Sequence, residues 1–169
     1  MTNIQKDEMV ALLKVFDNVG LLPYVVLVGS WAEYFYQEML EGFIPSIRTT
    51  DIDFYFPRGK KPATKIDVFT ELRSIGYLYE ENRGDESSRF VKVGGFEIEF
   101  LTHPGRDERK IFKIEYADIN AICLDKLDIF NKKGTIVSWA SKRVGVTVNL
   151  PSPATYIIQK LVINADRTP

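Results

Sequence analysis

Asp51 and Asp53 carry the clearest chemical signal in the sequence, because they stand two positions apart in an otherwise apolar run. On a β-strand this spacing places both carboxylates on one face, together with Tyr55, and turns the apolar residues between them toward a core. Like charges this close raise each other's pKa unless a cation lies between them. Mg²⁺ prefers oxygen ligands of this kind. The pair therefore predicts half of a metal site.

A second acid-apolar-acid segment, from Glu97 to Glu99, lies further along the chain. Its alternation again places two carboxylates on one face. If this strand lies beside the first with its polar face on the same side, Asp51, Asp53 and one glutamate would hold two Mg²⁺ ions. Two such ions, roughly 3.5–4 Å apart, clamp the attacking and leaving oxygens in phosphoryl or nucleotidyl transfer. The alternation alone leaves Glu97 and Glu99 as equal candidates.

Gly29 and Ser30 follow a short apolar run and precede a segment with helical spacing over 31–40. At such a strand-to-helix junction the first backbone N–H groups of the helix are free to bind a phosphate. We therefore expect Ser30 and the amides beside it to meet the outer phosphates of a nucleotide. Taken alone, the same pair is typical of a helix cap, since serine favours the N-cap and glycine is common at junctions.

Periodicity and turn residues predict the order of elements around these candidates. The expected helices cover 3–19, 31–40, Pro62 to Gly76 and 154–165. The expected strands cover 24–28, 51–56, 77–80, 89–93, 96–101 and 144–150, with a loop over 81–88. Residues 111–133 mix strand alternation with a possible helical stretch at 124–130. This order predicts an α/β or α+β domain with a mixed sheet flanked by helices.

Length and composition suit one globular domain over residues 1–169, since 45% of the residues are hydrophobic. The final helix, at about 153–165, is a candidate start for a C-terminal helical region. Lysine and arginine number 22 against 23 acidic residues, and the net charge of -1 gives no general attraction to duplex nucleic acid or to an anionic membrane. With the single Cys123, no leader at Met1 and no apolar run of the roughly 20 residues that span a bilayer, we expect a soluble cytoplasmic protein.

Taken in order, Gly29-Ser30, Asp51-Ile52-Asp53 and Ile98-Glu99-Phe100 resemble the DNA polymerase β-like nucleotidyltransferase superfamily. The resemblance extends toward its bacterial abortive-infection toxin type and toward uncharacterised nucleotidyltransferase-fold proteins. The further stretches that carry it are 48–50, 99–102 and 150–156, the last leading to Lys160-Leu161. The resemblance implies a nucleotidyltransferase fold, an NTP such as ATP as substrate, and Mg²⁺ or Mn²⁺ as cofactor.

The resemblance also implies a role for each matching residue. Asp51 and Asp53 correspond to metal ligands, and Glu99 corresponds to a third acid that binds metal and activates the attacking hydroxyl. Glu99 is favoured over Glu97 because it holds the family's position before Phe100-Leu101-Thr102. Close relatives more often have aspartate at this third position. The residues that correspond to phosphate contacts are Gly29, Ser30 and Lys160.

Two functions of different classes follow. The first is a Mg²⁺-dependent nucleotidyltransferase that moves a nucleoside monophosphate from an NTP to a hydroxyl of a small molecule, a protein or an RNA. The second is a catalytically silent module of the same fold that binds a nucleotide or a partner within a toxin-antitoxin or defence system. A metal-dependent nuclease is disfavoured, because neither Glu97 nor Glu99 is followed two positions later by lysine.

Three remaining features have plainer interpretations. The basic cluster Arg58, Lys60 and Lys61 is typical of a solvated turn, with steering of a nucleotide or nucleic acid as the alternative. His103, the only histidine, falls in a loop where contact with a substrate is the alternative. Aromatic residues at helical spacing are usually core, although they also stack on bases. These aromatic residues are Trp31, Tyr34, Phe35 and Tyr36.

Overall fold

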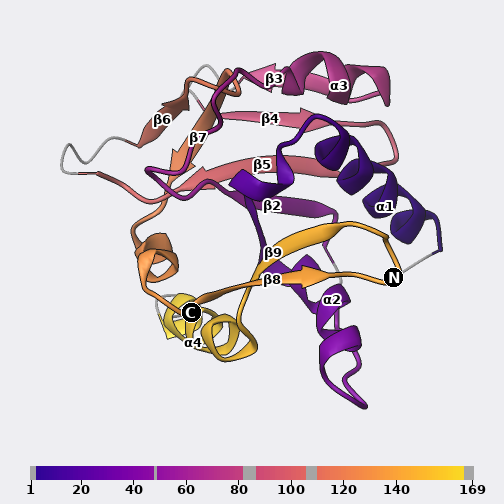
Figure 1. Ribbon diagram of the computed structural model, residues 1–169, viewed down its shortest axis with the longest axis vertical. Helices are drawn as coiled ribbons and strands as arrows, with labels where there is room; N and C mark the ends of the chain where they lie inside the picture. The colour runs from indigo at the N-terminus through magenta and orange to yellow at the C-terminus, as the bar shows by residue number, and fades with distance from the viewer. Residues whose placement is uncertain (1–2, 48, 82–86, 106–109, 166–169) are drawn as a thin grey trace.

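Short apolar and alternating segments become strands in the computed structural model, which describes residues 3–47, 49–81, 87–105 and 110–165 (Figure 1). The strands are β1 (Val26–Val28), β2 (Asp51–Tyr55), β3 (Leu78–Glu81), β4 (Ser88–Val91), β5 (Glu97–Thr102), β6 (Ile111–Ile114), β7 (Ile119–Cys123), β8 (Ile136–Ala140) and β9 (Thr147–Pro151). The α-helices are α1 (Asn3–Asn18), α2 (Ala32–Met39), α3 (Val68–Ser74) and α4 (Pro153–Ala165). The 3-10 helices are η1 (Leu22–Tyr24), η2 (Gly29–Trp31) and η3 (Asp125–Asn131).

Seven of the described strands form one mixed sheet. The order along it is β1-β2-β5-β4-β3, with β7 beside the end of β5 and β6 beyond β7. The pairing of β2 with β5 is parallel, whereas β1 with β2 and β4 with β5 are antiparallel. Strands β8 and β9 form a separate antiparallel hairpin. The predicted mixed sheet flanked by helices is confirmed.

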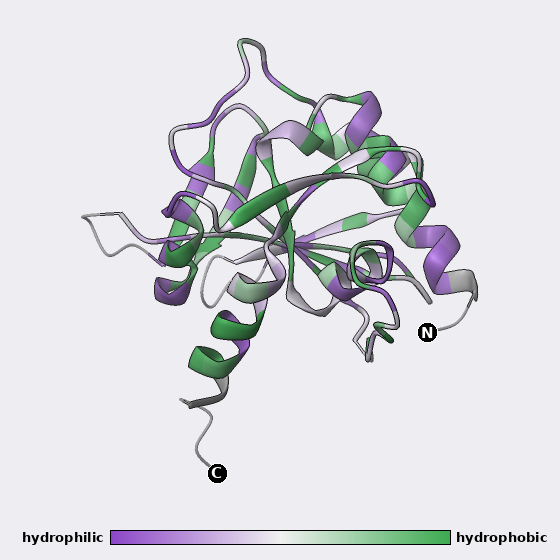
Figure 2. Cartoon of the chain, turned by 60° about the horizontal axis from the view of Figure 1, so that its bottom comes forward, coloured by the Kyte–Doolittle hydropathy of each residue, from purple (hydrophilic) through white to green (hydrophobic). Residues whose placement is uncertain are grey.

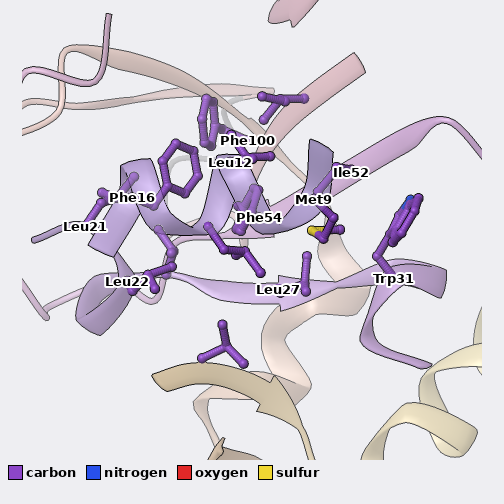
Figure 3. Close-up of a cluster of buried hydrophobic side chains, with 14 of the residues drawn as sticks. Met9, Leu12, Phe16, Leu21, Leu22, Leu27, Trp31, Ile52, Phe54 and Phe100 are labelled. Carbon is purple, nitrogen blue, oxygen red and sulfur yellow. The ribbon is translucent and has the colours of Figure 1, made fainter. Parts of the chain in front are cut away.

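Helix α1 covers one face of the sheet because its apolar residues recur on a single side. Figure 3 shows Met9, Leu12 and Phe16 of α1 packed over Phe54 of β2 and Phe100 of β5. The rings of Phe16 and Phe54 meet edge to face, with their centroids 4.9 Å apart. All five residues are fully buried. Burial of this size stabilises each large side chain by roughly 1.5–3 kcal/mol, so this face of β2 is fixed firmly against the helix.

The opposite face of β2 runs from solvent into a second, smaller apolar cluster. Asp51 is exposed, Asp53 is half-buried and Tyr55 is fully buried along the same side of the strand. The cluster around Tyr55 also contains Leu127 and Phe130, both from η3. The expected polar face therefore becomes apolar at its C-terminal end, and the carboxylates lie at the border between this cluster and water.

The third helix differs from its prediction. We expected it to begin near Pro62, but α3 begins at Val68 and ends at Ser74. Asp67 is the N-cap, and its carboxylate accepts a hydrogen bond from the backbone N–H of Thr70 at 2.9 Å. Upstream of this cap, the N–H of Ile66 donates to a carbonyl outside the helix. The capping aspartate therefore sets the start of the helix rather than the proline.

The bounds of several other elements also differ from their predictions. The strand expected over 24–28 begins only at Val26, because the preceding proline favours the 3-10 turn η1. Gly94, with φ +71°, lies in the predicted hairpin turn, and the strands around it fall within about two residues of their expected bounds. The helical stretch expected over 124–130 is the 3-10 helix η3, and 111–123 forms a hairpin. The strand expected over 144–150 begins at Thr147, since Gly145 turns the chain there. The loop expected over 81–88 lies largely outside the described residues.

Helix α4 extends away from the sheet toward the C-terminus, and Figure 2 shows that much of its surface is apolar. Its side chains Ile157 and Leu161 are 58% and 64% exposed. The other side of the helix is attached to the body, where the Tyr156 hydroxyl donates to Glu33 on α2. In the part of the chain that the structure describes, no helix is both long enough and apolar enough to cross a membrane.

Candidate active site

The parallel pairing of β2 with β5 brings the two acidic segments side by side. Asp51 is opposite Glu97, and Asp53 is opposite Glu99. Residues in register on neighbouring strands point to the same face of a sheet, so all four carboxylates lie on the side away from α1. The sequence-based condition for a three-carboxylate site, neighbouring strands with their polar faces on one side, is therefore met.

Gly29 is the point where the strand-to-helix junction touches this acidic face. Its backbone has φ +69°, a left-handed conformation that glycine adopts without steric cost. A Cβ atom at this position would lie 2.6 Å from Oδ2 of Asp53. The antiparallel pairing of β1 with β2 sets this approach, because Val28 is the register partner of Asp53. Glycine is thus required here by both the backbone conformation and the neighbouring carboxylate.

Asp53 has the most perturbed carboxyl group of the site. Burial, followed by the charges of Glu99 and Asp51, raises its pKa from 3.8 to about 7, while the charge of Lys160 lowers it. A pKa of about 7 means that a proton and a cation compete for this carboxylate near neutral pH. Asp53 therefore has the electrostatic character of a group that gains from a bound cation.

Glu99 and Glu97 share a strand face but differ in surroundings. Arg89 on β4 binds Glu97, with Nη1 2.7 Å from Oε2, and also binds Glu80 at 3.2 Å. The pKa of Glu99 is raised by burial and then by the charges of Asp51 and Glu97, against a smaller lowering by Arg89. Glu97 is thus held by a surface ion pair, while Glu99 faces the cavity described below.

Asp51 lies at the exposed start of β2 and is held by its own turn. The hydroxyl of Thr49 donates to Oδ2 of Asp51 at 3.1 Å and accepts from the Asp51 N–H at 3.0 Å. These bonds orient the carboxylate from the stretch that precedes the acid pair. Arg48, the first residue of that stretch, lies outside the described residues.

A cavity of about 450 Å³ opens onto Asp53 and Glu99. Gly29 forms part of one wall, and α4 forms another through Lys160. The Lys160 ammonium group lies 5.3 Å from the ring centroid of Tyr156, one turn earlier on the same helix. The remaining lining residues are Val28, Leu101, Leu124, Asp125, Lys126, Leu127, Gln159 and Ile163. The cavity combines three carboxylates, two lysines and an apolar wall.

Glu99 also lines a second cavity, of about 430 Å³, on the side of β4. Its other lining residues are Glu80, Glu81, Ser87, Ser88, Arg89 and Ile122. This second cavity is more polar than the first in its residue types. Glu99 therefore stands between two hollows, one shared with Asp53 and one shared with Arg89.

One residue predicted to contact phosphate does not reach the cavity. Ser30 lies half-buried in η2 and does not line the cavity, although the glycine before it does. Sequence reasoning missed the walls supplied by η3, such as Asp125, and by α4, such as Gln159 and Ile163. The α4 residues had a usable signal, since positions 159, 160 and 163 fall on one side of a helix. No pattern in the sequence linked η3 to the acidic strands.

His103 contacts other residues of the fold, and the predicted aromatic cluster is buried. The Tyr55 hydroxyl lies 2.7 Å from Nδ1 of His103 and donates to Oδ1 of Asn131 at 3.2 Å. Burial and then the charge of Arg58 lower the pKa of His103, with a smaller opposing effect of Asp128. The aromatic residues expected to pack are buried, and these are Trp31, Tyr34, Phe35 and Tyr36.

The donor set fits a divalent cation in its chemistry. Asp51, Asp53 and Glu99 offer hard oxygen ligands whose mutual repulsion a cation would relieve. Within the described residues, no group of three or more His, Cys, Asp or Glu side chains is already arranged to hold a metal ion. Mg²⁺ commonly binds through one or two carboxylates together with waters and substrate phosphates, rather than in a closed protein cage. An open arrangement of this kind is therefore compatible with Mg²⁺.

The sequence model of a nucleotidyltransferase family matches residues 7–169. Because the match spans almost the whole chain, the protein belongs to this family. Membership supports transfer of a nucleoside monophosphate as the general reaction and an NTP as substrate. The match is to the family as a whole and does not single out a toxin type. No curated protein and no solved structure matches the chain.

Proposed function

We propose that the protein is a Mg²⁺-dependent nucleotidyltransferase that moves a nucleoside monophosphate from an NTP to a hydroxyl of an acceptor. The acceptor oxygen attacks the α-phosphorus, the bond between the α-phosphorus and the bridging oxygen breaks, and pyrophosphate leaves with the bonding electron pair. The observation that carries the proposal is the meeting of Asp53, Glu99 and Lys160 at one cavity beside Gly29.

Lys160 and the junction at Gly29 are proposed to bind the triphosphate. Lys160 carries the positive charge in this wall that already acts on Asp53. A lysine ammonium group binds phosphate oxygens as a point charge. Because Gly29 has no side chain of its own, its backbone is free for a phosphate to approach closely. Together they would orient the α-phosphorus toward the two strands that carry the acids.

Glu99 is proposed to take the proton from the acceptor hydroxyl. A general base works best when its pKa lies near the working pH, and burial moves the pKa of Glu99 in that direction. Its place between the two cavities lets it face both a nucleotide and an acceptor. We propose that the acceptor, a small molecule, protein or RNA, approaches from the cavity lined by Arg89.

Asp51, Asp53 and Glu99 are the proposed ligands of Mg²⁺, with Mn²⁺ as a substitute. The bound ion would supply charge neutralisation at the reacting phosphate. The side chains themselves restrict where it binds, because Asp53 is pinned against Gly29 and Asp51 is oriented by Thr49.

The experiment compares two glutamates on the same strand face. Pyrophosphate release from NTPs is measured with Mg²⁺ over a panel of small hydroxyl compounds, protein and RNA. Glu99→Gln is expected to lower turnover by roughly 10²- to 10⁴-fold, the range for loss of a general base. Glu97→Gln is the matched control and is expected to stay within a few fold, because Glu97 is bound to Arg89. Equal effects of the two substitutions would overturn the assignment of Glu99.

A catalytically silent nucleotide-binding or partner-binding module of a toxin-antitoxin or defence system is the second candidate. The observation that favours it is the glutamate at the third acidic position, Glu99, where close relatives more often have aspartate. This function predicts NTP binding without pyrophosphate release on any member of the panel, with either Mg²⁺ or Mn²⁺. Steady turnover that depends on Asp53 would exclude it.

A further inference from the structure

A third cavity, of about 280 Å³, lies where the chain leaves β2 and passes β6, and the proposed reaction does not use it. We call it the basic-aromatic pocket. The lining residues that matter here are Phe56, Arg58, Lys60, Lys61, Phe112 and Tyr116. Aromatic rings and cationic side chains both line it. The protein carries a net charge of -1, so this concentration of positive charge is local.

Arg58 is the central residue of the basic-aromatic pocket. Its guanidinium carbon lies 4.0 Å from the ring centroid of Phe112, in a cation–π contact. A guanidinium group has five N–H donors. Among the described residues its acceptor is the Sγ atom of Cys123, at 4.0 Å, and its buried Nε has no hydrogen-bond partner. The Arg58 guanidinium group therefore lies over the Phe112 ring, while most of its hydrogen-bonding capacity remains unused within the described residues.

The two lysines next to Arg58 add positive charge to the pocket, whose lining also includes the carboxylate of Glu115. Lys60 and Lys61 are exposed, and neither forms an ion pair within the described residues. Lys60 lies over the ring of Tyr24, with Nζ 5.9 Å from the centroid. Lys113, which also lines the pocket, is by contrast paired with Asp118 at 2.7 Å. The free positive charge thus sits on the segment that follows β2.

A flat cation, aromatic walls and adjacent lysines together match the chemistry of a nucleotide. Nucleobases stack on aromatic rings and on arginine planes, and lysines bind phosphates. A cavity of about 280 Å³ is slightly smaller than the roughly 300–1,000 Å³ of sites that enclose drug-sized ligands. It therefore suits one nucleotide unit whose phosphate remains at the surface beside the lysines.

We propose that the basic-aromatic pocket binds one nucleotide unit, with its base against Arg58 and its phosphate beside Lys60 and Lys61. The unit is either part of a single-stranded nucleic acid or a free nucleotide. This inference goes beyond the proposed function, because it requires none of the carboxylates on β2 and β5. It also gives a function to a basic cluster whose sequence was typical of a solvated turn.

The test measures binding of a labelled single-stranded oligonucleotide by fluorescence anisotropy over a range of salt concentrations. A chelator is present, so that metal-dependent binding at the candidate active site does not contribute. Each phosphate contact with a single strand contributes about 0.7 to the slope of log Kobs against log salt. Lys60→Gln with Lys61→Gln is therefore expected to reduce the magnitude of this slope by about 0.7, because both lysines face the same phosphate. The matched control, Lys132→Gln with Lys133→Gln, changes two exposed lysines outside the pocket and is expected to leave the slope unchanged.

A second variant tests the stacked base. Arg58→Lys keeps the charge but removes the flat surface, so the oligonucleotide is expected to bind roughly fivefold more weakly with little change in salt slope. An abasic oligonucleotide is expected to bind wild type and Arg58→Lys equally. Because Lys60 and Lys61 are exposed, the lysine variant remains informative even if Arg58→Lys impairs folding.

The outcomes separate the two sources of the nucleotide. Competition by AMP with an affinity similar to that of the oligonucleotide assigns the site to a free nucleotide, whereas much weaker competition assigns it to a strand. Equal loss of binding in the two double-lysine variants, or none in either, overturns the proposal. Asp53→Asn is expected to retain this binding, so a failure of the proposed catalytic function would leave the result intact.

Discussion

Replacing Asp53 with asparagine is expected to stabilise the protein at neutral and alkaline pH when no divalent cation is present. In the native state the pKa of Asp53 is about 7, because of burial and the charges of Glu99 and Asp51, against a reference value of 3.8. Between these two values the native state holds a proton that the unfolded chain has released. The free energy of unfolding therefore falls as pH rises. This contribution is complete below about pH 4 and is lost as pH rises through about 7.

The magnitude follows from the shift itself. The difference between about 7 and 3.8 is about 3 pKa units, and each unit corresponds to about 1.4 kcal/mol. Ionised Asp53 thus costs up to about 4 kcal/mol at pH 8. Asparagine removes the charge but still places a polar amide in the same half-buried position. We therefore expect Asp53→Asn to raise the free energy of unfolding by roughly 2–4 kcal/mol at pH 8 and by much less at pH 5.

Urea denaturation of wild type and variant in a chelating buffer, at about pH 5 and about pH 8, measures this difference. Comparing the two proteins at each pH removes the contribution of His103, which is present in both. Mg²⁺ added at the higher pH should recover part of the stability of the wild type and little in the variant. Glu97→Gln, which changes a surface ion pair, is the control. Identical pH dependence in wild type and Asp53→Asn would refute the reasoning.

Two further substitutions test the local geometry. Gly29→Ala places a Cβ 2.6 Å from Oδ2 of Asp53 and a side chain on a left-handed backbone. Left-handed strain alone costs roughly 1–2 kcal/mol, so both thermal stability and NTP turnover should fall; an unchanged melting temperature would contradict this. Tyr55→Phe removes the hydroxyl that bonds His103 and Asn131 and should cost about 1–2 kcal/mol in urea denaturation, with pyrophosphate release little changed.

The acidic strands were predictable because their signal is local. A period of two around Asp51 and Asp53, and again around Glu99, fixes which side chains share a face whatever the strand pairs with. Whether these two strands pair with each other could not be predicted from the sequence. Parallel partners are joined by long crossovers, and no local sequence pattern identifies the residues that pair. The structure supplies that step by placing Asp53 opposite Glu99.

The errors arose where a tertiary contact overrode a local signal. Pro62 is a good first helical residue, yet the backbone at Ile66 bonds the turn after β6, and Asp67 caps the helix instead. Strand β8, Ile136–Ala140, was missed because its sequence alternates only weakly. It pairs with β9 because the chain reverses direction at the turn that contains Gly145. The cavity wall on η3 was also missed because it depends on tertiary packing. Leu127 lines the cavity and packs in the second apolar cluster.

The parallel pairing of β2 with β5 has a consequence for how the molecule forms. Asp53 and Glu99 are 46 positions apart (99 − 53 = 46), and contacts of such sequence separation form slowly because the entropy cost of closing the intervening chain comes first. During synthesis the aspartate pair emerges well before the glutamate. A partly made chain therefore carries the acidic pair without the third carboxylate, and the complete set arises only when the central sheet closes.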